Sequence, residues 1–381
     1  MSKLNSEGNQ AFTEANEAEN TVSEMLRDLS GVDEKQARSI VAAWGDWQLS
    51  DVLDTIVELR TFAETDRSLE FDTLFRAAIG FPEANVRLES VRALSNGGSV
   101  NIAQTLLEAL ERDEDARVRA AAAESLHAFA DPSQARNISG AALSRIAAAL
   151  SRAASQDESA VSGKALKALA AMRVEEVPDL IDAMFDDAIG DPELMSDVLL
   201  AMGESGDTSW LPTIEDAFYS GDAQIRIAAV MAFGEVAGDD DVESLSEPFD
   251  DHVLEVQMAT VQALANIGSP QAREMLSLAV KSSEPEVQQM AQTALDLLKA
   301  EDDLTYAVSP DMVAQGLFGV PLGARRPPRD LSRYDAPTEE GWANVTPEGQ
   351  EIDVANAPDD IGEDYEDYLE SDEFFRDSNT N

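Results

Sequence analysis

Three stretches of this 381-residue chain decide its fold: residues 85–95 read NVRLESVRALS, residues 116–131 read ARVRAAAAESLHAFAD, and residues 223–239 read AQIRIAAVMAFGEVAGD. Each contains an aliphatic residue followed by arginine, then small side chains, and a large apolar residue eight positions after the aliphatic one. Positions i, i+4 and i+8 lie on one face of an α-helix. Each stretch therefore predicts a helix with one buried stripe.

The same spacing recurs seven times between residues 69 and 300, and we call the aliphatic positions the opening residues: Val86, Val118, Val161, Leu194, Ile225, Val256 and Val287. They are separated by 32, 43, 33, 31, 31 and 31 positions, which leaves room for two short helices and two turns in each unit. The 43-residue step is expected to contain a longer first helix near residues 141–155. Turn residues punctuate the segments and strand patterns are absent, so the repetition predicts a helical array.

The quoted stretches resemble the second helix of HEAT repeats, of the short type found in bacterial phycobilisome-lyase-like repeat proteins. The resemblance extends over residues 67–300 and implies an all-α, right-handed α-solenoid of about seven HEAT-like helix pairs. In that family the arginine after the opening residue pairs with an acid of an adjacent turn. Only some units keep this arginine, so we expect an interrupted ladder of ion pairs, present at Arg87, Arg119 and Arg226 and missing at Ser162, Met195, Gln257 and Gln288.

Composition divides the chain into four parts. Residues 1–20 are polar and predict a disordered N-terminus, whereas residues 21–66 carry apolar stripes without the opening pattern and predict a helical cap for the solenoid of residues 67–300. Residues 301–381 contain 21 acids and five bases and predict an acidic, mostly disordered tail with short interaction segments.

Charge excludes several classes of partner. The chain has 75 acidic and 27 basic residues, a formal net charge of −48, which argues against binding nucleic acid or anionic membranes. The chain has no cysteine, which excludes disulfides, thiolate catalysis and sulfur-ligated metals. Residues 1–20 lack an apolar leader and no stretch is apolar enough to span a membrane, so we expect a cytoplasmic monomer with no membrane partner.

Candidate residues for chemistry are few. His127 follows Leu126 on a predicted helix, and His252 follows two aspartates without the spacing of a metal site. We therefore expect no catalytic residue, no metal ligand and no cofactor. Hydroxylases with HEAT-like repeats bind iron through His-Glu pairs, and this sequence has none.

Two functions are consistent with these features. The first is a non-catalytic scaffold or adaptor that binds a protein partner, basic or extended, on the concave face of the solenoid. The alternative, implied by the resemblance alone, is a bilin lyase of the phycobiliprotein type or a chromophore-handling factor. Such a lyase needs tyrosines or other proton-handling groups in its groove, but four of the five tyrosines lie at or beyond Tyr306.

The tail supplies the candidate docking residues. Ser309-Pro310-Asp311 is a helix-start signal before Met312–Leu317. A basic island and an acidic-aromatic segment follow, and we expect them to contact a partner or the acidic solenoid itself; a tail that only confers solubility is the alternative. The residues concerned are Arg325, Arg326, Arg329, Arg333, Tyr365, Tyr368, Leu369, Phe374 and Phe375.

Overall fold

The computed structural model of the protein describes residues 27–95 and 97–307. Within these ranges all regular structure is helical, with sixteen α-helices, four short 3-10 helices and no strand. The predicted all-α solenoid of HEAT-like helix pairs is confirmed. The predicted N-terminal segment 1–20 and the tail beyond residue 307 lie outside the described residues.

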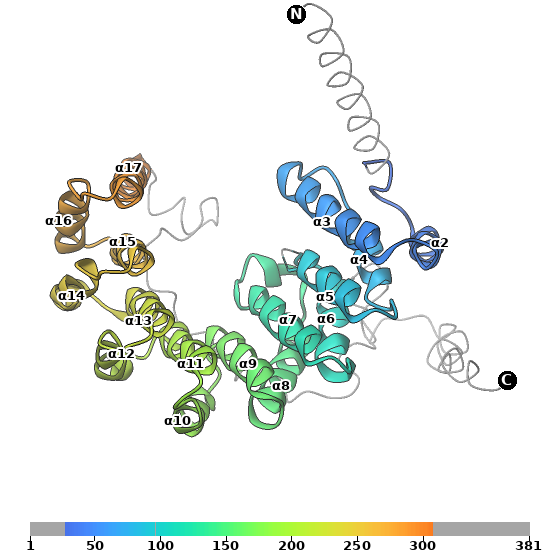
Figure 1. Cartoon of the computed structure of the whole chain (residues 1–381), viewed down its shortest axis with the longest axis horizontal. Coiled ribbons are helices and arrows are strands. Elements are labelled where there is room, and N and C mark those ends of the chain that lie inside the picture. The colour runs from blue at the N-terminus through green and yellow to red at the C-terminus, as the bar shows by residue number, and fades with distance from the viewer. Residues whose placement is uncertain (1–26, 96, 308–381) are drawn as a thin grey trace, which may run out of the picture.

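The helices follow one another as eight successive pairs (Figure 1). The first helices of the pairs are α2 (Glu34–Trp44), α4 (Asp72–Ala78), α6 (Val100–Arg112), α8 (Gly140–Gln156), α10 (Val177–Asp187), α12 (Leu211–Ala217), α14 (Ser246–Phe249) and α16 (Pro270–Ala279). The second helices are α3 (Leu49–Thr65), α5 (Ala84–Ala93), α7 (Ala116–Leu126), α9 (Ser159–Ala171), α11 (Pro192–Ser205), α13 (Ala223–Val236), α15 (Leu254–Ile267) and α17 (Pro285–Ala307).

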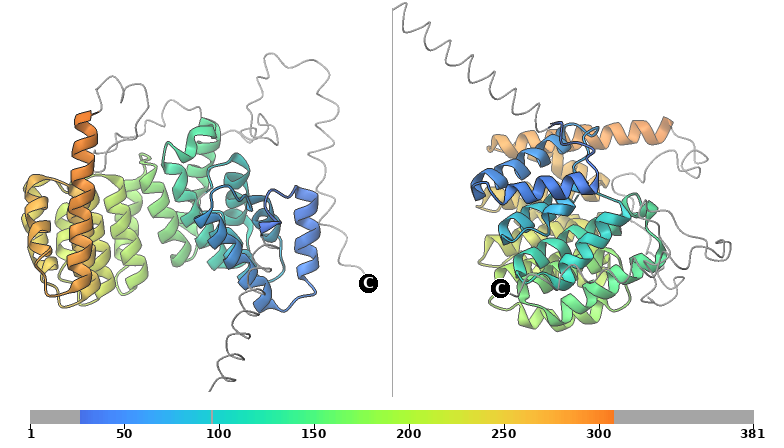
Figure 2. Two further views of the ribbon diagram at one scale, coloured as in Figure 1. Left: turned by 90° about the horizontal axis from the view of Figure 1, so that it is seen from above. Right: turned by 90° about the vertical axis from the view of Figure 1, so that its right-hand side faces the viewer.

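The pairs stack into an arc (Figure 1). The second helices α9, α11, α13 and α15 line its inner side, and the first helices α10, α12 and α14 line its outer side. The concave face is therefore built from second helices. At the end of the array α17 extends past its neighbours (Figure 2), because it has 23 residues where α15 has 14.

The core follows the predicted register of the second helices. Six of the seven opening residues are buried, while Ile225 is half-buried. The large residues eight positions later are buried except Leu295, which is half-buried because no described helix follows α17. The residues at the fourth position are all fully buried: Ser90, Ala122, Ala165, Val198, Ala229, Thr260 and Ala291.

Three features add detail to the simple alternation of first and second helices. Helix α8 has 17 residues against 13 in α6, but the 43-residue step also contains a long linker over residues 127–139, with the 3-10 helices η1 (His127–Ala130) and η2 (Gln134–Asn137). The first helix of the seventh pair is split into η4 (Asp239–Leu245) and α14, because Pro248 has no N–H to donate in a continuous α-helix. Helix α17 runs to Ala307, so residue 300 lies within this helix.

Candidate functional site: the concave face and its terminal groove

An arginine at the start of a second helix, buried at Arg87 and Arg226 and half-buried at Arg119, joins neighbouring pairs at three places. Arg87 in α5 donates two hydrogen bonds, each 2.8 Å long, to the carboxylate of Asp113 in the turn before α7. It also donates to the backbone carbonyl of Pro82 at 2.8 Å. The guanidinium thus donates hydrogen bonds to a backbone carbonyl in the turn of its own pair and to a carboxylate in the turn of the next pair.

Arg119 and Arg226 repeat this geometry. Arg119 donates to Asp157 at 2.9 and 2.6 Å, and Arg226 donates to Asp251 at 2.7 and 3.0 Å. The hydrogen bond from Arg119 lowers the pKa of Asp157. Burial raises the pKa of Asp251, but hydrogen bonds from Arg226 and from the backbone N–H of Val253 outweigh burial and lower it overall. Both carboxyl groups are therefore ionised at neutral pH.

Where the arginine is missing, its aspartate partner is missing too. Met195 and Gln257 take the arginine position in the 31-residue register, and Ser220 and Ser282 take the aspartate position. Gln257 keeps one of the contacts, since its Nε2 donates to the carbonyl of Asp251 at 2.6 Å. A lone buried arginine would leave an uncompensated charge, so losing both partners destabilises less than losing one. The ladder of ion pairs is interrupted, as the sequence predicted.

Glycine lets the middle second helices approach closely. A Cβ atom at Gly203 in α11 would lie 2.7 Å from the Cα of Ala232 in α13, and one at Gly234 in α13 would lie 2.7 Å from the Cα of Ala263 in α15. These helices therefore pack backbone against backbone. The next position in the same register is Ala265 in α15, whose methyl group does not permit α17 the same approach.

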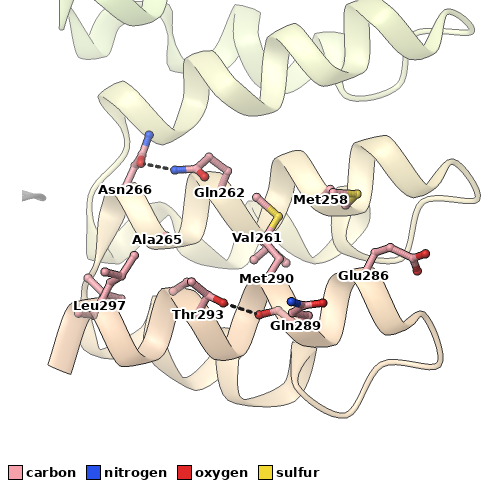
Figure 3. A pocket seen from close by; sticks show the side chains of 12 residues that line it. Met258, Val261, Gln262, Ala265, Asn266, Glu286, Gln289, Met290, Thr293 and Leu297 are labelled. Carbon is pink, nitrogen blue, oxygen red and sulfur yellow. Dashed lines mark hydrogen bonds between the residues drawn. The ribbon is translucent and has the colours of Figure 1, made fainter. Parts of the chain in front are cut away.

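A groove of about 480 Å³ opens between α15 and α17 at this point (Figure 3). Met258, Val261 and Met290 form its apolar middle, with Leu297 at one end and Glu286 at the other. Glu286 is the single charged residue among the described residues that line it. The groove therefore presents a mainly apolar surface that is open to solvent.

Polar side chains along the groove have hydrogen-bond partners. The amide of Gln262 donates to Asn266 at 3.0 Å, and Asn266 donates to Glu235 of the preceding second helix at 3.0 Å. The hydroxyl of Thr293 donates to the backbone carbonyl of Gln289 at 2.9 Å. These partners leave the apolar residues as the surface that binding would bury.

One buried carboxylate lies between α9 and α11. Oδ1 of Asp197 accepts a hydrogen bond of 2.9 Å from Lys164, but its buried Oδ2 has no hydrogen-bond partner. Burial raises the pKa of Asp197 although Lys164 opposes this shift. A Cβ atom at Gly163 would lie 2.7 Å from Oδ2, so the glycine makes room for this carboxylate.

The structure places the two predicted histidines apart. His127 opens η1, and its Nε2 lies 3.1 Å from Oε1 of Glu204 at the end of α11. Sequence reasoning missed this contact, because 77 positions separate the two residues. His252 lies in an exposed turn, with its Nδ1 3.3 Å from Oδ1 of Asp251. Over the described ranges no three His, Cys, Asp or Glu side chains are grouped so that they could hold a metal ion.

The predicted docking residues between Arg325 and Phe375 lie outside the described residues. Sequence analysis also missed the groove between α15 and α17. The sequence feature that could have indicated the groove is a change from glycine to alanine at one position of the 31-residue repeat, which holds glycine at 203 and 234 and alanine at 265. In the described part of the chain, no helix combines the length and the apolar character needed to cross a membrane.

Residues 54–127 and 71–143 of the chain match the family model of HEAT repeats. No curated protein matches the sequence. Among solved structures, the chain is similar to the complex of CpcE and CpcF of phycocyanin lyase from Nostoc, with 16% identity, a TM-score of 0.46, and coverage of 64% of this chain and 91% of that one. Human deoxyhypusine hydroxylase gives 14% identity, a TM-score of 0.31, and coverage of 70% and 98%. YibA from Escherichia coli gives 13% identity, a TM-score of 0.41, and coverage of 74% and 96%.

Proposed function

We propose that the chain, which is a HEAT-repeat protein, is a non-catalytic scaffold that binds a protein partner on its concave face. The observation that carries this proposal is the open apolar groove at the inner side of α15 and α17. HEAT repeats generally mediate protein contacts, and stacked second helices form a continuous surface for an extended partner.

The composition of this face indicates the chemistry of the partner. Met231 in α13 is 44% exposed and takes the register position that Gln262 takes beside the groove, and Met258 and Met290 follow along the array. Methionine side chains adapt to partners of different shape. Residues 1–300 contain 54 acids and 22 bases, so the surrounding field favours a partner with basic residues. We therefore propose a partner segment that is apolar on one side and basic on the other.

The groove residues support a binding function over the alternative of a bilin lyase. No histidine, tyrosine, lysine or arginine is found among the described residues that line the groove. Tyr219 is 70% exposed in the turn between α12 and α13 and does not line it. Proton transfer in the groove would depend on Glu286 alone, whereas an apolar side chain can be bound without any titratable group.

Site-specific photocrosslinking in the full-length chain tests the scaffold. A photoreactive residue at Met231 on the inner helix α13 is compared with one at Leu278 on the outer helix α16, where exposure is 44% and 59% respectively. We expect Met231 to yield a discrete cross-linked protein in the native cytoplasm and Leu278 to yield none. Equal products from both positions, or no product from Met231, would contradict binding on the concave face.

A spectroscopic assay tests the alternative. Purified full-length protein is incubated with a bilin and an acceptor phycobiliprotein, and the visible spectrum is followed. We expect neither a shifted bilin band nor covalent transfer to the acceptor. Transfer would overturn the non-catalytic assignment.

A further inference from the structure

The groove between α15 and α17 is an unfilled apolar surface. Its volume is about 480 Å³, and it is open to water. Leu297 at its end is 55% exposed, and Met258 and Met290 are half-buried. Replacing this water by apolar side chains is favourable, so the groove suits a short apolar segment.

The sequence directly after α17 contains such a segment. Residues 309–318 read SPDMVAQGLF, a helix-start signal followed by about two turns of predicted helix. A helix this short is not stable alone in water, so it needs a surface to pack against. The side chains that would share one helical face are Val313, Ala314, Leu317 and Phe318.

The chain is long enough to reach the groove. Helix α17 ends at Ala307, ten residues after Leu297, which is about 15 Å along the helix axis. The five peptide steps from Ala307 to Met312 span up to about 17 Å when extended. The chain can therefore turn back and bring Met312 level with Leu297. A helix that continues antiparallel to α17 then brings Leu317 level with Gln292, two residues from Met290.

The distribution of charge along the tail favours this segment, and not the rest of the tail, as the occupant of the groove. Residues 308–334 contain four arginines and two aspartates, whereas residues 335–381 contain 16 acids and one arginine. The array before the tail is acidic, and Glu286 lies in the groove itself. The segment near residue 312 and the basic island after it are attracted to this surface, while the acidic-aromatic end of the tail is repelled.

We propose that residues 312–318 dock as a short helix in the groove between α15 and α17, so that the protein covers its own concave surface. A partner that binds this part of the face must displace the segment. This contact is intramolecular and goes beyond the scaffold function, because it holds whether or not a partner binds elsewhere on the concave face.

Disulfide trapping in the full-length chain tests the contact, and the absence of native cysteine makes it specific. Gln262→Cys combined with Leu317→Cys is compared with Tyr219→Cys combined with Leu317→Cys. A disulfide needs Cα atoms about 4 to 7 Å apart. We expect an intrachain disulfide in the first variant alone, with a yield that does not change on dilution, read by peptide mass spectrometry.

Three outcomes would overturn the proposal: no disulfide, equal yields in the two variants, or disulfides only between chains. The last outcome would assign the groove to a second copy of the protein. Photocrosslinking at Met231 detects a bound partner protein, whereas the disulfide detects the contact with the tail. Each proposal can therefore fail without the other.

Substitutions within the tail provide a second, independent readout. Phe318→Asp in the Gln262→Cys/Leu317→Cys background places a carboxylate on the docking face, and we expect trapping to slow about tenfold. Gln315→Asp introduces the same charge on the opposite face and is expected to leave the trapping rate unchanged. Both substitutions lie beyond Ala307, and circular dichroism checks that the helical array is unchanged. Equal slowing by both would show that charge alone, and not an apolar contact, governs trapping.

Discussion

Arg226 and Asp251 show how one residue pair fixes the spacing of two helix pairs. The guanidinium donates to a carboxylate of the next pair and to the carbonyl of Ser220 in its own turn, at 2.9 Å. The two side chains are 7% and 10% exposed, so neither charge is well hydrated without the other. Removal of one partner therefore lowers the free energy of unfolding by more than the net contribution of the ion pair, because the other charge stays buried without a partner.

Replacement of Arg226 by Gln tests this contact. We expect Arg226→Gln to lower the free energy of unfolding by about 3 kcal/mol, because Asp251 stays buried without its counter-charge. Arg117→Gln is the matched control: Arg117 also pairs with an aspartate, at 2.7 Å, but its side chain is 60% exposed. The control is expected to have little effect in urea unfolding. Equal losses in the two variants would contradict the role assigned to burial.

Asp197 gives a pH-dependent prediction. Its pKa in the folded protein is raised by burial above the ordinary value of 3.8, so the ionised form is disfavoured on folding. The contribution of this group to stability is thus fully present below the unfolded pKa and is lost as the pH rises through the folded pKa. We expect Asp197→Asn to be more stable than the original protein at neutral pH, with a difference that shrinks as the pH falls toward about 4. Urea unfolding at several pH values measures this.

Asp115 is a control, because its pKa is shifted in the opposite direction from that of Asp197. Hydrogen bonds from the exposed side chain of Arg117 and from its backbone N–H, which Arg117→Gln retains, lower the pKa of Asp115 to about 2, so its contribution is present above 3.8 and is lost as the pH falls through about 2. Asp115→Asn is therefore expected to be less stable than the original protein at neutral pH. If Asp197→Asn were also less stable there, the contact with Lys164 would outweigh burial.

At the scale of the element, the second helices combine two kinds of contact. Gly203 and Gly234 let helix backbones touch, while the arginine–aspartate pairs join the turns at the starts of these helices. Helix α13 has both kinds of contact to α15, whereas α15 meets α17 with Ala265 and Gln257 in the corresponding positions. The spacing of second helices therefore varies along the array.

A transplanted ion pair tests whether the register alone determines this contact. Gln257→Arg and Ser282→Asp recreate, one repeat later, the 25-residue separation of Arg226 and Asp251. We expect the two changes to be coupled by about 1 kcal/mol in a double-mutant cycle, because each introduced charge needs the other. The free energies of unfolding of the two single variants and the double variant give the coupling. Additive effects would show that the local spacing at α17 does not support the pair.

The same elements show what sequence can predict. Val118, Ala122 and Leu126 shared a helical face in the sequence pattern, and all three are buried, because helical periodicity determines burial directly. The groove could not be predicted in this way. Its position depends on the distance between the second helices of two successive repeats, and the local signal was a single methyl group at Ala265. Likewise, only the fold brings His127 to Glu204.

At the scale of the whole molecule, charge repulsion opposes the compact array. Residues 1–300 carry 54 acids and 22 bases, and the three arginine–aspartate pairs between repeats neutralise few of them. The repulsion acts over a Debye length of about 30 Å at 0.01 M salt and about 3 Å at 1 M salt.

Salt is therefore expected to stabilise the protein. The melting temperature should rise as KCl is increased from about 0.01 M to about 1 M, because exposed repulsions are screened more strongly than buried pairs. Circular dichroism measures the transition, and choline chloride in place of KCl separates screening from binding of a specific cation. A melting temperature that falls throughout this range would show that repulsion does not limit stability.

The unequal seams also govern how the array would respond to force. Helices α16 and α17 are linked by Arg273, which donates to Asp302 at 2.8 and 3.1 Å. The seam that joins this helix pair to α15 has no glycine within the helix at the register position of Gly203 and Gly234, and Gln257 and Ser282 stand where an arginine–aspartate pair would be. In a repeat array each unit is held only by its neighbours, so the weakest seam yields first. Since residues 308–381 are attached to α17, tension on the tail acts on this seam. We expect such tension to separate α16 and α17 from α15 before any other two repeats separate.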